Sequence, residues 1–154
     1  MDMRWHRLET EQVVAAGLDD TFGFFADAGN LETLTPPFLR FRIVTPRPIA
    51  MREGARIEYR LRLRGVPVRW LTRIDEWRPG VGFVDRQLSG PYAAWIHRHD
   101  FERHTCGTLV RDRVDYALPL DPLSRPLHRL LVRPDLERIF GYRRDAVARV
   151  LGTV

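Results

Sequence analysis

Residues capable of chemistry alternate through the second half of the chain. His97 and His99 are separated by a single residue, with Asp85 before them and Asp112 after them. Successive side chains of a β-strand point to opposite faces, so His97 and His99 share one face if this segment is a strand. An imidazole beside a carboxylate can transfer a proton as a general acid or base. If the surrounding segments are neighbouring strands, these four residues form one candidate group.

Several uses of this group are open from the sequence. His97, His99 and Asp112 are candidate catalytic residues, because an imidazole could take a proton alpha to a carbonyl while an aspartate orients the ring. Two histidines and a carboxylate can also bind a transition metal, but a His-x-His pair is common and we expect no metal. The group could instead anchor the polar end of an apolar ligand. It could also be an internal hydrogen-bonded network that binds nothing.

Other chemistries lack their motifs. The chain contains no Gly-x-Ser-x-Gly sequence, no glycine-rich phosphate loop and no zinc-type spacing of cysteine and histidine. We therefore expect no cofactor, no nucleotide and no covalent nucleophile.

The hydrophobic pattern predicts the elements that position the group. Residues 55–64 give the clearest signal, because apolar residues alternate with arginines and one glutamate. A strand with one apolar face suits an antiparallel sheet covered on one side. The predicted order is a strand over 4–16, a helix capped by Asp19 or Asp20, a short helix over 31–34, six strands over 39–45, 55–64, 68–77, 83–88, 93–103 and 108–117, and a long helix from Pro134 to about Leu151.

This order predicts an α+β fold in one domain over residues 1–154. A twisted meander of about seven strands curls, and its concave apolar face needs the terminal helix as a cover. The helix offers an apolar stripe of Leu136, Ile139, Phe140, Ala146, Val147 and Val150. We expect space to remain inside as a pocket.

Alternation assigns the residues that face this pocket. Asp85 and Gln87 share a face with Phe83, so both are expected to join the histidines. Arg143 follows the helix stripe and is expected either to meet an acidic ligand at the pocket mouth or to lie on the surface. The predicted ligand-binding residues are Tyr59, Leu61, Trp70, Thr72, Phe83, Asp85, Trp95, His97, His99, Phe101, Asp112, Tyr116, Ile139, Phe140 and Arg143.

Short stretches spread over nearly the whole chain carry a family resemblance. They are Val68-Arg69-Trp70, Phe83-Val84-Asp85-Arg86-Gln87, Gly90-Pro91-Tyr92 with Trp95, His97 and Phe101, Asp112-Arg113-Val114-Asp115-Tyr116, Leu136-Glu137-Arg138-Ile139-Phe140 and Tyr142-Arg143-Arg144. With them the chain resembles the START/SRPBCC superfamily, and within it the bacterial ligand-binding SRPBCC and polyketide cyclase/dehydrase-like group. The motifs are specific for this group and not for one chemistry.

The resemblance implies a helix-grip fold, in which the curved sheet wraps around the C-terminal helix. It also implies that a hydrophobic or amphipathic small molecule is bound or carried in the cavity. Relatives catalyse cyclisation and dehydration, so a lyase or isomerase of that type is the first alternative, although no catalytic signature carries over. A second alternative is a protein-interaction module with a filled, vestigial cavity.

The overall composition limits the classes of binding partner. The net charge is +5, but every Lys/Arg position is arginine and acidic residues are interleaved, so we expect no nucleic-acid binding. No apolar run approaches the roughly 20 residues that cross a bilayer, and the first residues lack a signal-peptide pattern. The single cysteine, Cys106, suits a hairpin turn in a reducing compartment. We expect a cytoplasmic monomer or homodimer without stable membrane insertion.

Overall fold

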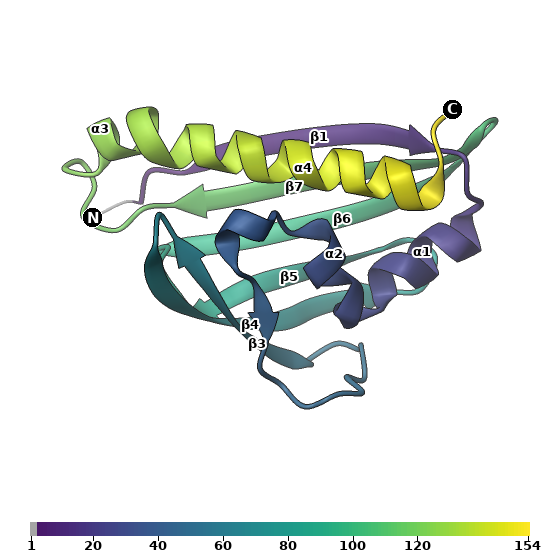
Figure 1. Ribbon diagram of the computed structural model, residues 1–154, viewed down its shortest axis with the longest axis horizontal. Coiled ribbons are helices and arrows are strands. Elements are labelled where there is room, and N and C mark those ends of the chain that lie inside the picture. The colour runs from purple at the N-terminus through teal and green to yellow at the C-terminus, as the bar shows by residue number, and fades with distance from the viewer. Residues whose placement is uncertain (1–2) are drawn as a thin grey trace.

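A computed structural model describes residues 3–154 and contains one seven-stranded antiparallel sheet in the order β1-β7-β6-β5-β4-β3-β2 (Figure 1). The strands are β1 (His6–Val14), β2 (Arg42–Ile43), β3 (Arg56–Leu63), β4 (Val66–Arg78), β5 (Gly82–Ser89), β6 (Ala94–His104) and β7 (Gly107–Ala117). The predicted succession of one strand, two short helices, six strands and a terminal helix is confirmed.

The helices lie over one face of the curved sheet (Figure 1). They are α1 (Leu18–Ala26), α2 (Leu31–Leu34), α3 (Arg125–Leu127) and α4 (Arg133–Leu151), with 3₁₀ turns at Ala28–Asn30 and Pro37–Leu39 and a π-helical turn at His128–Val132. The long helix α4 lies along β1 and β7, and its C-terminus is tied to the β1–α1 connection by a hydrogen bond of 2.9 Å from the Ala16 amide to the Leu151 carbonyl.

Local chemistry explains the element boundaries. A two-residue turn joins β3 to β4, and both of its residues are left-handed, with φ 49° at Arg64 and 80° at Gly65. Such turns match the right-handed twist of paired strands. Cys106 lies exposed in the β6–β7 turn, as predicted.

Three local predictions were wrong. Strand 39–45 contracts to two residues, because Pro37–Leu39 forms a 3₁₀ turn and Arg40 is left-handed at φ 47°. Neither Asp19 nor Asp20 caps α1, since Gly17 is the cap and both aspartates lie inside the first turn. Val150 leaves the predicted stripe and is 49 % exposed.

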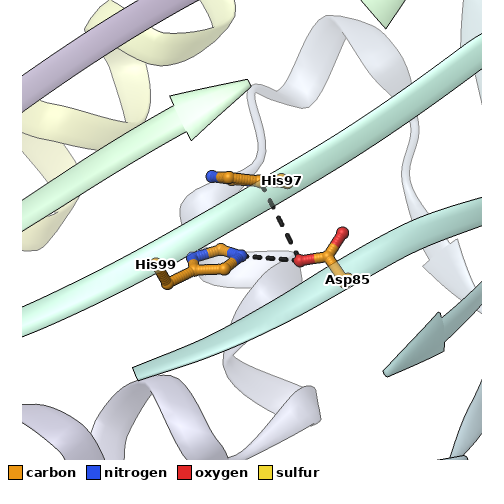
Figure 2. A group of neighbouring side chains, drawn as sticks. All are labelled: Asp85, His97 and His99. Carbon is orange, nitrogen blue, oxygen red and sulfur yellow. Dashed lines mark hydrogen bonds and ion pairs between the residues drawn. The ribbon is translucent and has the colours of Figure 1, made fainter. Parts of the chain in front are cut away.

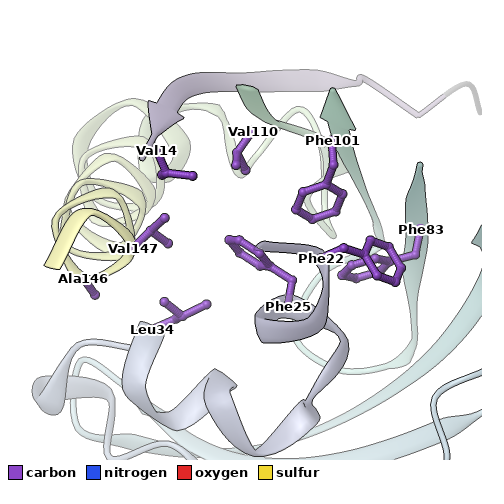
Figure 3. Close-up of a cluster of buried hydrophobic side chains, with 9 residues drawn as sticks. All are labelled: Val14, Phe22, Phe25, Leu34, Phe83, Phe101, Val110, Ala146 and Val147. Atoms are coloured by element: carbon purple, nitrogen blue, oxygen red, sulfur yellow. The ribbon is translucent and has the colours of Figure 1, made fainter. Parts of the chain in front are cut away.

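The largest apolar cluster forms where α1 and α4 meet the sheet (Figure 3). It fills the end of the molecule near the C-terminus, and Phe22 packs against Phe101 with ring centroids 5.4 Å apart. A second cluster around Trp95, Tyr116 and Phe140 lies further along α4. The sheet's concave face between and beside these clusters is not filled.

Candidate functional site

A cavity of about 180 Å³ lies between the sheet, α4 and the α1–α2 segment. Most of its lining is apolar, with a polar group at one place on the β5–β6 wall. The filled interior expected of a vestigial cavity does not match this structure. Twelve of the fifteen predicted ligand-binding residues line the cavity. They are Tyr59, Leu61, Trp70, Thr72, Phe83, Asp85, Trp95, His97, His99, Ile139, Phe140 and Arg143.

Three predicted residues lie outside the lining. Phe101 packs against α1, with its ring 5.1 Å from that of Phe25. The Tyr116 hydroxyl is 2.7 Å from His128 Nε2, under the chain that leads into α4. Asp112 lies behind the two histidines, to which it is bonded. The predicted inward faces of β6 and β7 are correct. However, only the middle of this face lines the cavity, because helices cover its two ends.

Gln87 also does not join the polar group. Its side-chain amide instead makes two hydrogen bonds to Tyr92 in the β5–β6 connection. Nε2 donates to the Tyr92 carbonyl at 2.9 Å, and Oε1 accepts from the Tyr92 amide at 3.1 Å. The residue holds a turn and does not face a ligand.

Sequence reasoning missed part of the lining. Ile57, Leu63 and Ile74 lie on the strand faces that alternation predicts to be inward, but they were not in the predicted ligand-binding set. Others come from α1, α2, the 3₁₀ turn between them and the irregular chain that follows α2, none of which was assigned to the cavity from the sequence. They close the end of the cavity beneath the short helices: Phe24, Phe25, Asp27, Ala28, Asn30, Leu31, Leu34, Thr35, Leu39, Phe41 and Met51.

The polar group is a crosswise network of two histidines and two aspartates. In strand register Asp85 lies opposite His97, and Asp112 lies opposite His99. The short bonds run diagonally: His99 Nε2 is 2.6 Å from Asp85 Oδ2, and His97 Nε2 is 2.7 Å from Asp112 Oδ1 (Figure 2 shows the Asp85 side). The weaker contacts are 3.3 Å from His99 Nδ1 to Asp112 and 4.0 Å from His97 Nδ1 to Asp85.

Aromatic rings hold the imidazoles in place. The rings of His97 and His99 stack with centroids 3.7 Å apart, and Phe83 stacks on His99 at 4.1 Å. Phe140 of α4 meets His97 edge-on at 5.6 Å. Because two cations would repel at this spacing, the stack favours one positively charged imidazole over two.

Arg143 completes the group from α4. Its guanidinium is 3.5 Å from His99 Nδ1 and 3.7 Å from Asp112 Oδ1, and its side chain is 11 % exposed. Arg143 is therefore neither at the surface nor free at the mouth, because it pairs with a buried carboxylate. Its Nε is buried without a hydrogen-bond partner among residues 3–154.

The environment drives the ionisation states apart. Burial and the neighbouring His99 lower the pKa of His97 below 6.5. Burial alone would also lower the pKa of His99, but its bonds to Asp112 and Asp85 raise it above 6.5. Burial opposes ionisation of Asp112, yet Arg143 and then the histidines hold its pKa well below 3.8. Burial also opposes ionisation of Asp85, but its bond to His99 and the two imidazoles lower the pKa of Asp85 below 3.8. The result is two ionised carboxylates facing one basic and one weakly basic imidazole.

Three side chains of the polar group lie close enough together to be considered as metal ligands. Atoms of Asp85, His97 and His99 all lie within 4.8 Å of one another. However, an imidazole lone pair lies in the ring plane, and the two rings are stacked at 29° instead of converging on one point. The Arg143 cation beside His99 adds repulsion for a second cation. The geometry favours hydrogen bonding over metal ligation.

Comparison with known proteins identifies the architecture. No family model matches the chain, and no curated protein does. Solved structures do match. A START superfamily protein from Mycobacterium smegmatis has a TM-score of 0.68 at 15% identity, over 94% of this chain and 99% of that one. The ZhuI aromatase/cyclase from Streptomyces sp. R1128 gives 0.67 at 17%, over 98% and 100%, and protein CV1439 from Chromobacterium violaceum gives 0.74 at 13%, over 96% and 98%.

The chain has the START-like helix-grip fold. The resemblance noted from the sequence is thus confirmed at the level of architecture, including the curved sheet around α4. Within residues 3–154, none of the helices has the length and apolar composition needed to cross a bilayer.

Proposed function

We propose that this helix-grip protein binds a hydrophobic or amphipathic small molecule in its central cavity. The observation that carries the proposal is a mostly apolar cavity with one convergent polar group, which is the usual make-up of a small-molecule site. An apolar protein cavity of about 150 Å³ accommodates benzene. The cavity of about 180 Å³ therefore suits a compound with one or two rings.

The polar group would orient such a ligand. Arg143 lines the cavity, and hydrogen bonds to charged groups contribute about 1.5–3 kcal/mol each. A carbonyl or hydroxyl oxygen of the ligand could accept a bond from a guanidinium N–H that faces the cavity. Because Asp85, His97 and His99 line the same wall, the polar end would lie against β5 and β6 and the apolar end toward Leu61 and Trp70.

A cavity-filling substitution tests the proposal. Leu61→Trp places a large ring in the cavity, whereas Val150→Trp adds the same ring on the exposed side of α4. Binding of an apolar fluorescent probe, and the thermal shift caused by phenols and by polyketide-like aromatics of one or two rings, would be measured for both. We expect Leu61→Trp to lose binding and Val150→Trp to keep it. Equal binding by both variants would place the ligand elsewhere.

The histidine–aspartate pairs favour a second candidate function, acid–base catalysis of a cyclisation or dehydration. Acid and base roles belong to groups whose environments push their pKa values apart, as occurs for His97 and His99. With its Nε2 proton donated to Asp112, His97 would keep Nδ1 free to take a proton alpha to a carbonyl. His99, held protonated by Asp85, could donate to a departing hydroxyl.

Turnover separates the two functions. A β-hydroxy ketone that fits the cavity becomes a conjugated enone on loss of water, and the enone absorbs in the near ultraviolet. The enzyme candidate predicts enone formation by the native protein and its loss in His97→Gln, with probe binding retained. Binding of the ketone without any enone would leave carriage as the function.

A further inference from the structure

A cluster of exposed leucines occupies the end of the molecule near the N-terminus and α3. Leu120, Leu123, Leu127 and Leu130 are 78, 81, 50 and 66 % exposed. Single exposed apolar residues are normal, but a group on one short segment marks an interaction site. Leu120 is also left-handed at φ 62°, which is uncommon for a bulky residue. We call residues 118–132 the leucine segment.

The N-terminal residues extend this surface. The His6 ring stacks on His128 with centroids 3.7 Å apart, which brings the start of β1 against the leucine segment. Just before His6, Met3 is 50 % and Trp5 46 % exposed. Tryptophan favours the boundary between lipid headgroups and hydrocarbon.

Positive charge accompanies the apolar side chains. Arg125 and Arg129 are exposed on the segment, and Arg4 is exposed beside Trp5. Asp121 is the only acidic residue of the leucine segment, and it lies 3.4 Å from Arg125. The surface therefore combines protruding leucines with an excess of arginine, which complements an anionic apolar interface.

The segment adjoins the cavity. A groove of about 340 Å³ is lined by the inner sides of Leu118, Leu123 and Leu127, together with Leu63 and Tyr92. Leu63 and Tyr92 also line the central cavity. These two side chains therefore lie between the central cavity and the exposed leucines. A ligand would pass between the cavity and the outside at this end of the molecule.

We infer that this end docks reversibly on an anionic phospholipid bilayer, with the leucines at the acyl boundary and the arginines at the headgroups. A protein partner would need a matching shape for leucines that protrude from a turn and from the helical turns after it, whereas lipid accepts them without one. A sparingly soluble ligand also partitions into bilayers. The docking itself does not depend on the proposed function. Only the purpose of the docking does, which is to load or release the cavity ligand at the membrane.

Vesicle flotation tests the docking without any cavity ligand. The full chain would be mixed with vesicles of phosphatidylcholine alone or with phosphatidylglycerol. The double variant Leu123→Asp/Leu127→Asp changes the surface. Val81→Asp in the β4–β5 turn is the control, because Val81 is 54 % exposed and Leu127 is 50 % exposed. Leu123→Ser/Leu127→Ser is a milder second version, and circular dichroism checks the fold of each.

We expect binding to the phosphatidylglycerol vesicles that falls at least tenfold in either double variant and not in Val81→Asp. Each arginine near an anionic surface is worth on the order of a fivefold change in partitioning, so Arg125→Gln/Arg129→Gln should weaken binding roughly 25-fold. Absence of binding to anionic vesicles would overturn the inference. So would a dimer in light scattering that the aspartate variant dissociates, because a second copy would then cover the leucines. Probe binding in vesicle-free solution reports on the cavity separately.

Discussion

Asp112→Asn is the sharpest perturbation of the buried network. The substitution keeps the shape of the side chain and removes the charge that His97, His99 and Arg143 share within 2.7, 3.3 and 3.7 Å. Hydrogen bonds to charged groups contribute about 1.5–3 kcal/mol each, and breaking a buried ion pair costs about 3–5 kcal/mol. The amide retains a neutral version of the short bond. We therefore expect a loss of about 3 kcal/mol in the free energy of unfolding.

Asp115→Asn on the same strand is the matched control. Asp115 accepts a bond of 2.7 Å from Arg7, but its partner is 55 % exposed, and such surface pairs contribute below about 1 kcal/mol. Urea unfolding would measure both variants. For a chain of this length, about 3 kcal/mol corresponds to roughly 6–12 °C in Tm.

The same variant changes a titration. Bonds to Asp112 and Asp85 raise the pKa of His99 against the effect of burial, so Asp112→Asn should lower it, which histidine proton resonances would follow. If Asp112→Asn and Asp115→Asn destabilise equally and the His99 titration does not move, the network described here does not hold.

Three further predictions concern the same network and cavity. The raised pKa of His99 means that its proton stabilises the fold fully below pH 6.5 and less as the pH rises through the raised value. The stability difference between the native chain and His99→Gln should therefore shrink as the pH rises above 6.5 in urea unfolding; a difference that grows would contradict the assignment. Phe140→Ala should cost about 3–5 kcal/mol, because it removes a buried ring from the α4 contact with the sheet; a loss under about 1 kcal/mol would mean that α4 is not packed as described. Elemental analysis of the purified protein should find no stoichiometric transition metal, and a full equivalent would overturn the hydrogen-bonded reading.

The sequence predicted the pocket wall because that wall follows a simple period. Ile57, Tyr59 and Leu61 alternate with arginines, and the same period placed His97 and His99 on one inner face. Helical spacing from Ile139 and Phe140 brought Arg143 toward the cavity. These are local rules, and most of the residues that obey them were in the predicted set; Ile57, Leu63 and Ile74 were not.

The remaining features depend on contacts between distant segments. The diagonal pairing of Asp85 with His99 and of Asp112 with His97 requires the register of three strands and the side-chain rotamers. Phe101 alternates like its neighbours but is covered by α1, which no strand pattern reveals. Phe41 and Met51 reach the cavity from irregular chain.

Native mass spectrometry of the protein as purified from cells tests the central claim most directly. Denaturing extraction would then identify any molecule that is released. The account predicts a mass increment at near-stoichiometric yield from an apolar compound that carries an oxygen function, and its absence from Leu61→Trp. An unliganded protein that also shows no thermal shift with phenols and with polyketide-like aromatics of one or two rings would contradict a ligand-binding cavity.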